Sequence, residues 1–266
     1  MYFGKDVEYA MNSVIAILCI IINGSFEKDT DYRIALFILE HIHEMRSLSM
    51  SAIASSCLTS PATVKRFIRM LGHSNYSGFL FQIGNSLGIR EKQMAERFEN
   101  TDLNDLIQKA LTIYPDMDAD MLKESVVRMN DSIHSSPRVY ILGAAYPGAL
   151  AVNYQEDMFL LNKPVLIQPV IPSILNDLDG INEDDYVILA TVSGSLYRLN
   201  PMRENALKQF RNMAVITAES TDTSSFKDVL TIRLPQTKDD EKYNWFLMIF
   251  WQMMKHDYYE RYGMRR

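Results

Sequence analysis

Apolar residues in the first third of the chain recur every three or four positions, the spacing of one face of a helix. The pattern predicts helices over Val7–Ile22 and over Thr30–Met45. A short helix follows, capped by Ser47 or Ser49, since Met50, Ile53, Ala54 and Cys57 repeat at the same spacing. The first part of the chain is therefore expected to be entirely helical.

The next predicted helix, Ser60–Leu71, has two different faces. Ser60 is a favoured N-cap, Pro61 suits the first turn and Gly72 marks the end. One face is apolar and consists of Val64, Phe67, Ile68 and Leu71. The opposite face is small or basic and consists of Ala62, Lys65, Arg66 and Arg69. A short helix docked on one side and cationic on the other, after a tight turn, is typical of a helix-turn-helix that enters the major groove. A solvated face on an ordinary helical bundle is the alternative.

The distribution of charge favours a polyanionic partner. The chain has a formal net charge of −6, yet Arg46–Arg90 contains no Asp or Glu and carries +5, which leaves −11 elsewhere. A basic block in an acidic protein is an electrostatic footprint of nucleic acid, although chance clustering can produce one. The expected DNA-contacting residues are Ser60, Ala62, Thr63, Lys65, Arg66 and Arg69. The three cations would meet phosphates or guanine edges, while the two hydroxyls hold register.

Short apolar runs alternate with helical segments in the second half. The runs lie at 139–142, 165–167, 186–191, 213–217 and 229–234. Helices are expected from the first loop to about Leu161 and over Tyr197–Phe210, and the stretch Asn100–Ile133 ahead of the runs is also helical. The alternation predicts an α/β fold with a parallel sheet covered on both faces.

Ligands of such sheets bind beyond the carboxyl ends of the strands, where the strand order reverses. In a flavodoxin-like order the loops concerned are 143–148 and 191–195. Each leads into a helix N-terminus, which favours an anion, and the hydroxyls suit a sugar phosphate; ordinary Gly and Ser turn chemistry is the alternative. The candidate ligand-binding residues are Gly143, Ala144, Tyr146, Thr191, Ser193, Gly194 and Ser195.

The C-terminal helix is apolar on all sides over Trp245–Trp251, which requires burial on several sides. Either its own domain encloses it or it forms a subunit interface. An isomerase would need a base, and Glu156 and His256 are the candidates. Glu156 is expected to be a helix-surface carboxylate, and His256 a cation near a helix end.

Size and composition exclude several classes of protein. The chain has 266 residues, of which 47% are hydrophobic and 23% charged, so it is neither disordered, collagen-like nor a coiled coil. Cys19 and Cys57 are expected to be small buried residues, and neither a metal site nor a cofactor is predicted. Asp6 and Glu8 argue against a secretory signal, and the apolar runs are too short for a membrane span. A soluble cytoplasmic protein is expected.

The motif Ser60-x-Ala62-Thr63-Val64-x-Arg66-Phe67 resembles the helix-turn-helix of RpiR-type (MurR/RpiR) bacterial transcription regulators. Ile53-Ala54, Leu71-Gly72, Tyr76 and Phe79 extend the resemblance over about fifty residues. Leu58 departs from it, because the family usually has a residue there that turns easily, often glycine. Since a leucine disfavours positive φ, the turn is expected to be wider than usual.

Two later segments, Arg138–Leu142 with its loop and Val187–Ser195, look like the motifs of a sugar isomerase (SIS) domain. RpiR-type regulators carry this domain, which typically binds phosphorylated sugars through a Ser/Thr-x-Ser-Gly-x-Thr/Ser loop and a Gly-x-Gly-x-Ser loop. Thr191, Ser193 and Gly194 match the former, whereas Leu196 replaces its closing hydroxyl. In the latter, Ala145 replaces a glycine and Pro147 the serine.

The resemblance implies a helix-turn-helix domain over 1–85, a helical linker over 86–110 and a flavodoxin-like SIS domain over 111–266. The expected function is a transcriptional regulator of carbohydrate metabolism, not an enzyme. Its partners would be a double-stranded DNA operator and a phosphorylated sugar effector, and it would act as a homodimer or homotetramer. Two alternatives stay open: a SIS domain used only for dimerisation, and a phosphosugar isomerase, which would leave the basic helix unexplained.

Overall fold

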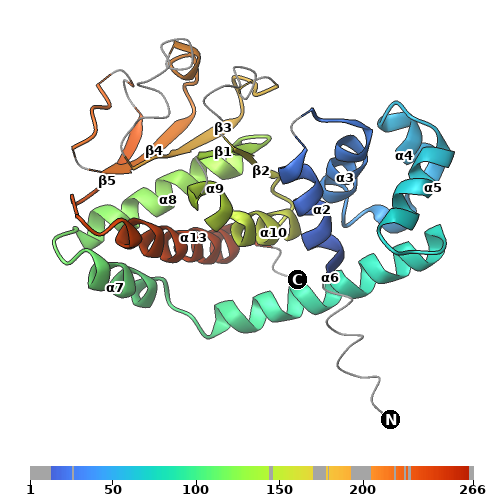
Figure 1. Ribbon diagram of the computed structural model, residues 1–266. Helices are drawn as coiled ribbons and strands as arrows, with labels where there is room; N and C mark the ends of the chain where they lie inside the picture. The colour runs from blue at the N-terminus through green and yellow to red at the C-terminus, as the bar shows by residue number, and fades with distance from the viewer. Residues whose placement is uncertain are drawn as a thin grey trace. The chain divides into compact units, whose positions relative to one another are not determined.

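The computed structural model describes residues 13–25, 27–143, 146–169, 178, 180–192, 205–218, 220–224, 226 and 229–263 (Figure 1). The chain divides into two compact units. The N-terminal unit consists of Met1–Arg97 with Glu156–Asn162, and the C-terminal unit of Phe98–Gln155 with Lys163–Arg266. The predicted boundaries at 85 and 110 fall inside two helices, Tyr76–Glu99 and Leu103–Ile113.

The N-terminal unit is helical, as predicted. Its elements are α2 (Ser13–Gly24), α3 (Thr30–Glu40), the 3-10 turn η1 (Met45–Ser47), α4 (Met50–Ser56), α5 (Pro61–Met70) and α6 (Tyr76–Glu99), whose last two residues belong to the C-terminal unit. Helix α3 ends five residues before the predicted Met45, because His41 leaves the helical conformation at its C-cap. Of the predicted helix Val7–Ile22, residues 7–12 lie outside the described part of the chain.

The core of the N-terminal unit is formed by the apolar faces of α3, α4 and α5. Ile34, Ile38 and Ile53 are completely buried, and Phe67 of α5 is 1% exposed. Cys19 and Cys57 are buried, as predicted. Burial raises the pKa of the Cys57 thiol, which keeps it protonated. Both cysteines therefore act as small apolar side chains.

A short segment from far along the chain completes the N-terminal unit. Glu156–Asn162 contains the last residues of α10 (Val152–Leu160) and packs within this unit, whereas the first residues of α10 belong to the C-terminal unit. Asp157 is 1% exposed and accepts hydrogen bonds from Arg97 Nη1 at 2.8 Å and Arg90 Nη2 at 3.3 Å. Glu156 pairs with the same Arg90 at 3.2 Å. His43 Nε2 lies 3.0 Å from the carbonyl oxygen of Leu160.

The C-terminal unit is an α/β fold with the predicted topology. Its strands are β1 (Val139–Gly143), β2 (Val165–Pro169), β3 (Tyr186–Ala190), β4 (Met213–Ala218) and β5 (Leu230–Leu234). All neighbouring strands are parallel, in the order β2-β1-β3-β4-β5, which is the flavodoxin-like order. In register, Ile141 of β1 stands between Ile167 of β2 and Ile188 of β3.

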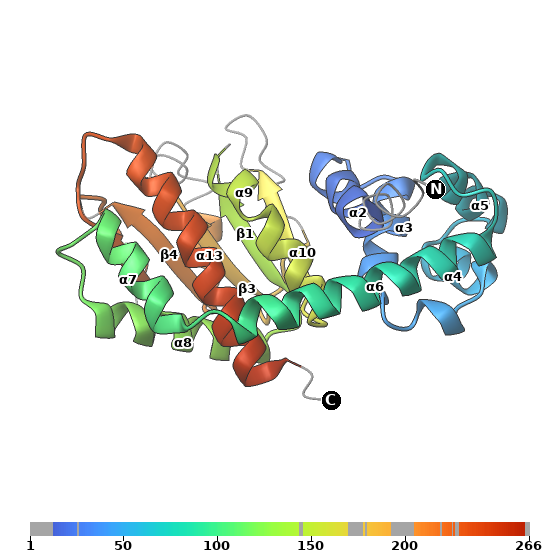
Figure 2. The same cartoon turned by 90° about the horizontal axis from the view of Figure 1, so that it is seen from below.

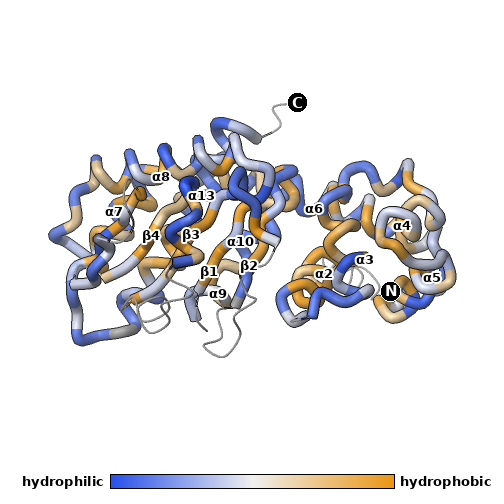
Figure 3. Tube along the Cα trace, turned by 90° about the horizontal axis from the view of Figure 1, so that it is seen from above, coloured by the Kyte–Doolittle hydropathy of each residue, from blue (hydrophilic) through white to orange (hydrophobic). Residues whose placement is uncertain are grey.

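Helices cover this sheet. The described helices are α7 (Leu103–Ile113), α8 (Ala119–Ser135), α9 (Tyr146–Leu150) and α13 (Asp240–Tyr262), besides the start of α10. Figures 1 and 2 show α8, α9 and α13 over one face of the sheet. All residues of β1 and β3 are buried, so both faces are covered, as predicted, and Figure 3 shows these strands as strongly hydrophobic. The single stretch expected over Asn100–Ile133 is two helices, because Asp118 caps a new one.

Helix α13 supplies much of the core of the C-terminal unit. Phe246, Phe250 and Trp251 are at most 2% exposed, as the apolar sequence requires. Its other side is not enclosed by this unit, since Trp245 is 51% and Met248 53% exposed. The described helices include none long and apolar enough to cross a bilayer.

Candidate nucleic-acid interface and effector loops

Helix α5 presents the predicted cationic face to solvent. Val64, Phe67 and Ile68 are buried against the N-terminal unit. The residues predicted to contact DNA are exposed, apart from the half-buried Thr63: Ser60, Ala62, Lys65, Arg66 and Arg69. Docking of the apolar face thus leaves the opposite face free for a ligand as wide as duplex DNA.

The start of α5 is fixed by its own residues. Ser60 Oγ accepts a hydrogen bond from Thr63 N at 3.1 Å and lies 3.0 Å from Thr63 Oγ1. Pro61 stands at the first helical position, where no hydrogen-bond donor is needed. Ser60 therefore confirms the predicted N-cap, and the two hydroxyls hold each other in place at the end of α5 that would approach base edges.

The turn that leads into α5 differs from expectation. Leu58 adopts φ +49° and closes a tight αL turn, so the prediction of a wider turn was wrong. Two hydrogen bonds form the turn, Leu58 N to Ser55 O at 3.1 Å and Thr59 N to Ala54 O at 2.8 Å. These are the two bonds of a Schellman motif at the C-terminus of α4, and they hold a leucine in a conformation that usually needs glycine.

The cations of Arg46–Arg90 do not all belong to the surface. Arg46, Lys65, Arg66 and Arg69 are exposed, but the Arg90 side chain is 17% exposed and paired with Glu156 and Asp157. The sequence hides this because the acids lie more than sixty residues away. One arginine of the acid-free block therefore serves the fold of the N-terminal unit.

Two neighbours of this surface modify its charge. Arg66 Nη2 lies 3.5 Å from Asp31 Oδ1 of α3, while the Arg66 side chain stays 72% exposed. Burial lowers the pKa of His73, which follows α5 directly, so at neutral pH His73 adds no positive charge. The exposed lysine and arginines supply the positive charge.

The predicted effector loops lie at the carboxyl ends of β1 and β3, as the strand order requires. Gly143 closes β1 so tightly that a Cβ there would stand 3.0 Å from Gly148 N. Tyr146 is 71% exposed, and Thr191 is buried, its backbone N donating to Ile216 O at 2.9 Å. Four of the predicted ligand-binding residues lie outside the described residues: Ala144, Ser193, Gly194 and Ser195.

The sequence did not point to a group of threonines that anchors the loop after β3. The carbonyl oxygen of Val192 accepts from Ala218 N at 3.1 Å, from Thr221 Oγ1 at 3.1 Å and from Thr217 Oγ1 at 3.3 Å. Arg233 Nη1 in turn donates to Thr221 O at 2.9 Å. Isolated threonines carry no motif, so only their convergence in space shows that they fix the start of this loop.

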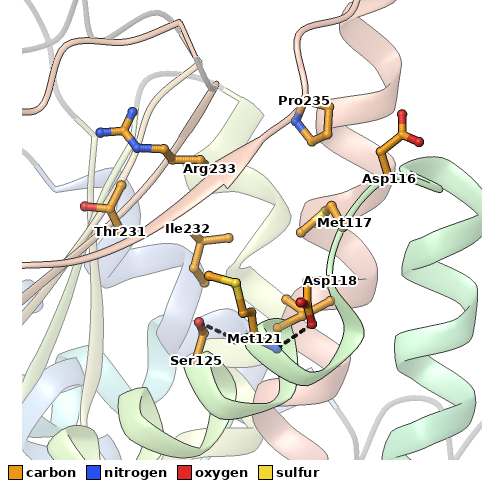
Figure 4. A pocket seen from close by; sticks show the side chains of 10 residues that line it. Asp116, Met117, Asp118, Met121, Ser125, Thr231, Ile232, Arg233 and Pro235 are labelled. Carbon is orange, nitrogen blue, oxygen red and sulfur yellow. Dashed lines mark hydrogen bonds between the residues drawn. The ribbon is translucent and has the colours of Figure 1, made fainter.

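A cavity of about 390 Å³ lies elsewhere in the C-terminal unit, between the start of α8 and the edge strand β5 (Figure 4). Figure 4 shows Asp116 and Arg233 on opposite sides of it, with Met117, Met121 and Ile232 between them. The carboxylates of Asp116 and Asp118 would repel a phosphate, and Arg233 is bonded to Thr221 and Thr223. This cavity therefore does not suit a sugar phosphate.

Both candidate bases have structural surroundings that the sequence predicted wrongly. Glu156 is not a freely solvated helix-surface carboxylate, because its side chain is 17% exposed and paired with Arg90. His256 is not a helix-end cation in water: it is 1% exposed, and its Nε2 lies 2.5 Å from the carbonyl of Thr101. The two residues belong to different units. Among the described residues, no group of three or more His, Cys, Asp or Glu side chains could hold a metal ion.

Comparisons with known proteins agree with this geometry. Residues 22–88 match the family described as "Helix-turn-helix domain, rpiR family". The HTH-type transcriptional regulator GlvR of Bacillus subtilis (strain 168) is 24% identical over 187 residues, which are 68% of each chain. An uncharacterized HTH-type transcriptional regulator in the aarA 3′ region of Providencia stuartii is 23% identical over 212 residues, 73% of this chain and 71% of the relative.

Among solved structures, the Vibrio vulnificus NanR protein complexed with ManNAc-6P matches 94% of this chain and 92% of its own, at 16% identity and a TM-score of 0.43. The matched family segment, 22–88, contains α3, α4 and α5 complete and the first half of α6. The N-terminal unit thus carries a helix-turn-helix domain of the RpiR family.

Proposed function

We propose that this protein is a DNA-binding transcriptional regulator that reads its operator with α5. The observation that carries the proposal is the two-sided burial of α5, which is docked through Val64, Phe67 and Ile68 and exposes Lys65, Arg66 and Arg69. An exposed arginine can pair with phosphates or with guanine edges in the major groove. The family of the domain and the two curated regulators support the same function.

Selection from a random duplex library by the full chain tests DNA binding for an operator of any sequence. We expect a selected duplex to bind at least ~1,000-fold more tightly than its scrambled form. Its association constant should fall steeply with salt, because cationic side chains displace counterions from the phosphates. Failure to enrich any sequence, with folded protein, would contradict the proposal.

The effector that we propose is a phosphorylated sugar, held by the loops after β1 and β3. The strand order supports this place, and the close approach at Gly143 brings backbone from two sides of the first loop together. The resemblance of both loops to SIS motifs supports the ligand class. The effector must bind one arrangement of the protein better than another, since otherwise DNA affinity would not change.

A thermal-shift screen of hexose and pentose phosphates, with the unphosphorylated sugars as matched controls, tests the effector. A ligand at ~100 times its Kd should stabilise the protein by about 2.7 kcal/mol. Stabilisation by the phosphates alone is the expected result. If no sugar phosphate stabilises the folded protein, the C-terminal unit is a scaffold for assembly instead. That alternative has support from Trp245 and Met248, which stay exposed on α13.

Helix α10 offers a direct route from effector to DNA-binding unit. It follows the loop after β1, and it begins in the C-terminal unit and ends in the N-terminal unit. Its last turn is tied within the N-terminal unit to Arg90 and Arg97 of α6. We propose that a displacement of α10 on ligand binding reaches α6 through these ion pairs.

A further inference from the structure

Leu58 combines two features that are rarely found together in one residue. It is a non-glycine residue at φ +49°, and its side chain is 86% exposed. A leucine in the left-handed region brings its Cβ too close to the backbone, and exposure means that burial does not compensate for this. The side chain therefore adds little to the stability of the N-terminal unit.

The turn itself does not require a leucine. Helix α5 ends in the same motif as α4, with hydrogen bonds from His73 N to Ile68 O at 3.2 Å and from Gly72 N to Arg69 O at 3.0 Å. Gly72 occupies the left-handed position there, with φ +90°. One unit thus contains the same turn with the expected glycine and with Leu58. Strain that a fold does not need is a feature of functional sites.

The position of Leu58 indicates what it contacts. It stands two residues before Ser60, the N-cap of α5, and the exposed residues continue through Ser60 and Ala62 into the cationic face. In helix-turn-helix proteins the N-terminal end of the recognition helix meets the base edges. The apolar group that duplex DNA offers in the major groove is the 5-methyl group of thymine.

We propose that Leu58 is a specificity-determining residue that contacts a thymine methyl group in the operator. This inference rests on the proposed function, because it assumes that α5 lies in the major groove. Leu58 would add an apolar preference to the polar readout of Arg66 and Arg69, at a position next to the one read by Ala62.

Replacement of thymine by deoxyuridine tests the contact, because it removes the methyl group and keeps every hydrogen-bonding group. Each thymine of a selected duplex is replaced in turn, and binding of the wild-type protein and of Leu58→Ala is measured. We expect one replacement to weaken wild-type binding about fourfold, the effect of one buried methyl-sized group. Leu58→Ala should bind the unmodified duplex about tenfold more weakly and ignore that replacement.

Ile20→Ala is the matched control, because Ile20 is an aliphatic residue of the same unit that is 65% exposed. It should keep wild-type affinity and the wild-type response to deoxyuridine. The inference fails if Leu58→Ala retains that response, or if its loss of affinity follows a change in oligomeric state. If the wild-type protein selects no duplex at all, the proposed function fails first, so the two failures are distinguishable.

Discussion

Arg66 is held between the protein and its proposed ligand. Its guanidinium lies 3.5 Å from Asp31 while the side chain is 72% exposed, so the pairing is weak in water and leaves donors free. An arginine in this position can turn from the carboxylate to a guanine edge or phosphate at little energetic cost. Asp31 would then orient Arg66 before DNA arrives.

Replacing Arg66 by alanine should weaken operator binding by ~1–3 kcal/mol, because a bidentate contact to DNA is lost. Fluorescence anisotropy with a selected duplex measures this change. Arg128→Ala is the control, since Arg128 is also an exposed arginine, 62% accessible, but lies on α8 of the C-terminal unit. Equal affinities of the two variants would remove Arg66 from the interface.

His73 should make the stability of the N-terminal unit depend on pH. Burial lowers its pKa from the usual 6.5, so the unfolded chain takes up the proton more readily than the folded one. The stabilising effect of the neutral ring is complete above pH 6.5 and is lost as the pH falls below that value. His73→Gln should show a flatter decline of Tm than the wild type between about pH 6.5 and 5.

NMR titration of the His73 ring checks the cause directly. The ring should titrate below the usual value of 6.5 in the folded protein. A ring that titrates above it would mean that a nearby acceptor, and not burial, dominates.

The helices that carry the candidate site are set by local signals, which is why the sequence could predict them. Ser49 and Ser60 cap α4 and α5 through their side chains, and Gly72 ends α5 in the left-handed region. The strands follow from apolar runs that are buried on both faces. Each of these features depends on residues within a few positions of one another.

The turn after α4 shows where local reasoning gave the wrong answer. Steric preference predicted a wide turn at Leu58, whereas the hydrogen bonds of Leu58 and Thr59 close a tight one. The two bonds stabilise the turn by more than the left-handed leucine costs, about 1–2 kcal/mol. A preference of one residue could not reveal this balance.

Leu58→Gly should therefore stabilise the protein. Relief of the left-handed strain contributes about 1–2 kcal/mol, and the greater freedom of glycine in the unfolded chain removes about 0.5–1 kcal/mol, so a small net gain is expected. Urea unfolding of the full chain measures it. Leu58→Ala keeps a Cβ and should show no such gain; equal gains in both variants would assign the effect to loss of the exposed side chain.

At the scale of the molecule, the pairing of α6 with Glu156–Asn162 was beyond sequence reasoning. Arg90 and Asp157 stand sixty-seven positions apart and belong to no motif, so charge counting assigned Arg90 to the DNA-binding surface. The sequence also placed a domain boundary inside α6, because nothing in its composition marks the point where contacts change. Long-range partners of this kind become visible only in three dimensions.

Asp157→Asn should destabilise the protein by about 3 kcal/mol, because it leaves Arg90 and Arg97 beside a neutral group in a mostly buried site. Glu96→Gln is the control on the same helix: Glu96 pairs with Lys92, and both side chains are more than 60% exposed. That variant should lose less than about 0.5 kcal/mol. Similar losses in urea unfolding would show that the Asp157 pairs do not stabilise the fold.

The contribution of Glu156–Asn162 to the N-terminal unit also limits how such a protein can be taken apart or recombined. A fragment cut after residue 97 would lose the only described acids that meet Arg90, together with the apolar residues Met158–Leu160 that are buried beside it. It should be poorly soluble unless the missing heptapeptide is supplied in trans. For the same reason, a chimaera that exchanges DNA-reading heads between relatives would need to transplant two separate stretches of gene, and a single crossover would produce a mismatched joint.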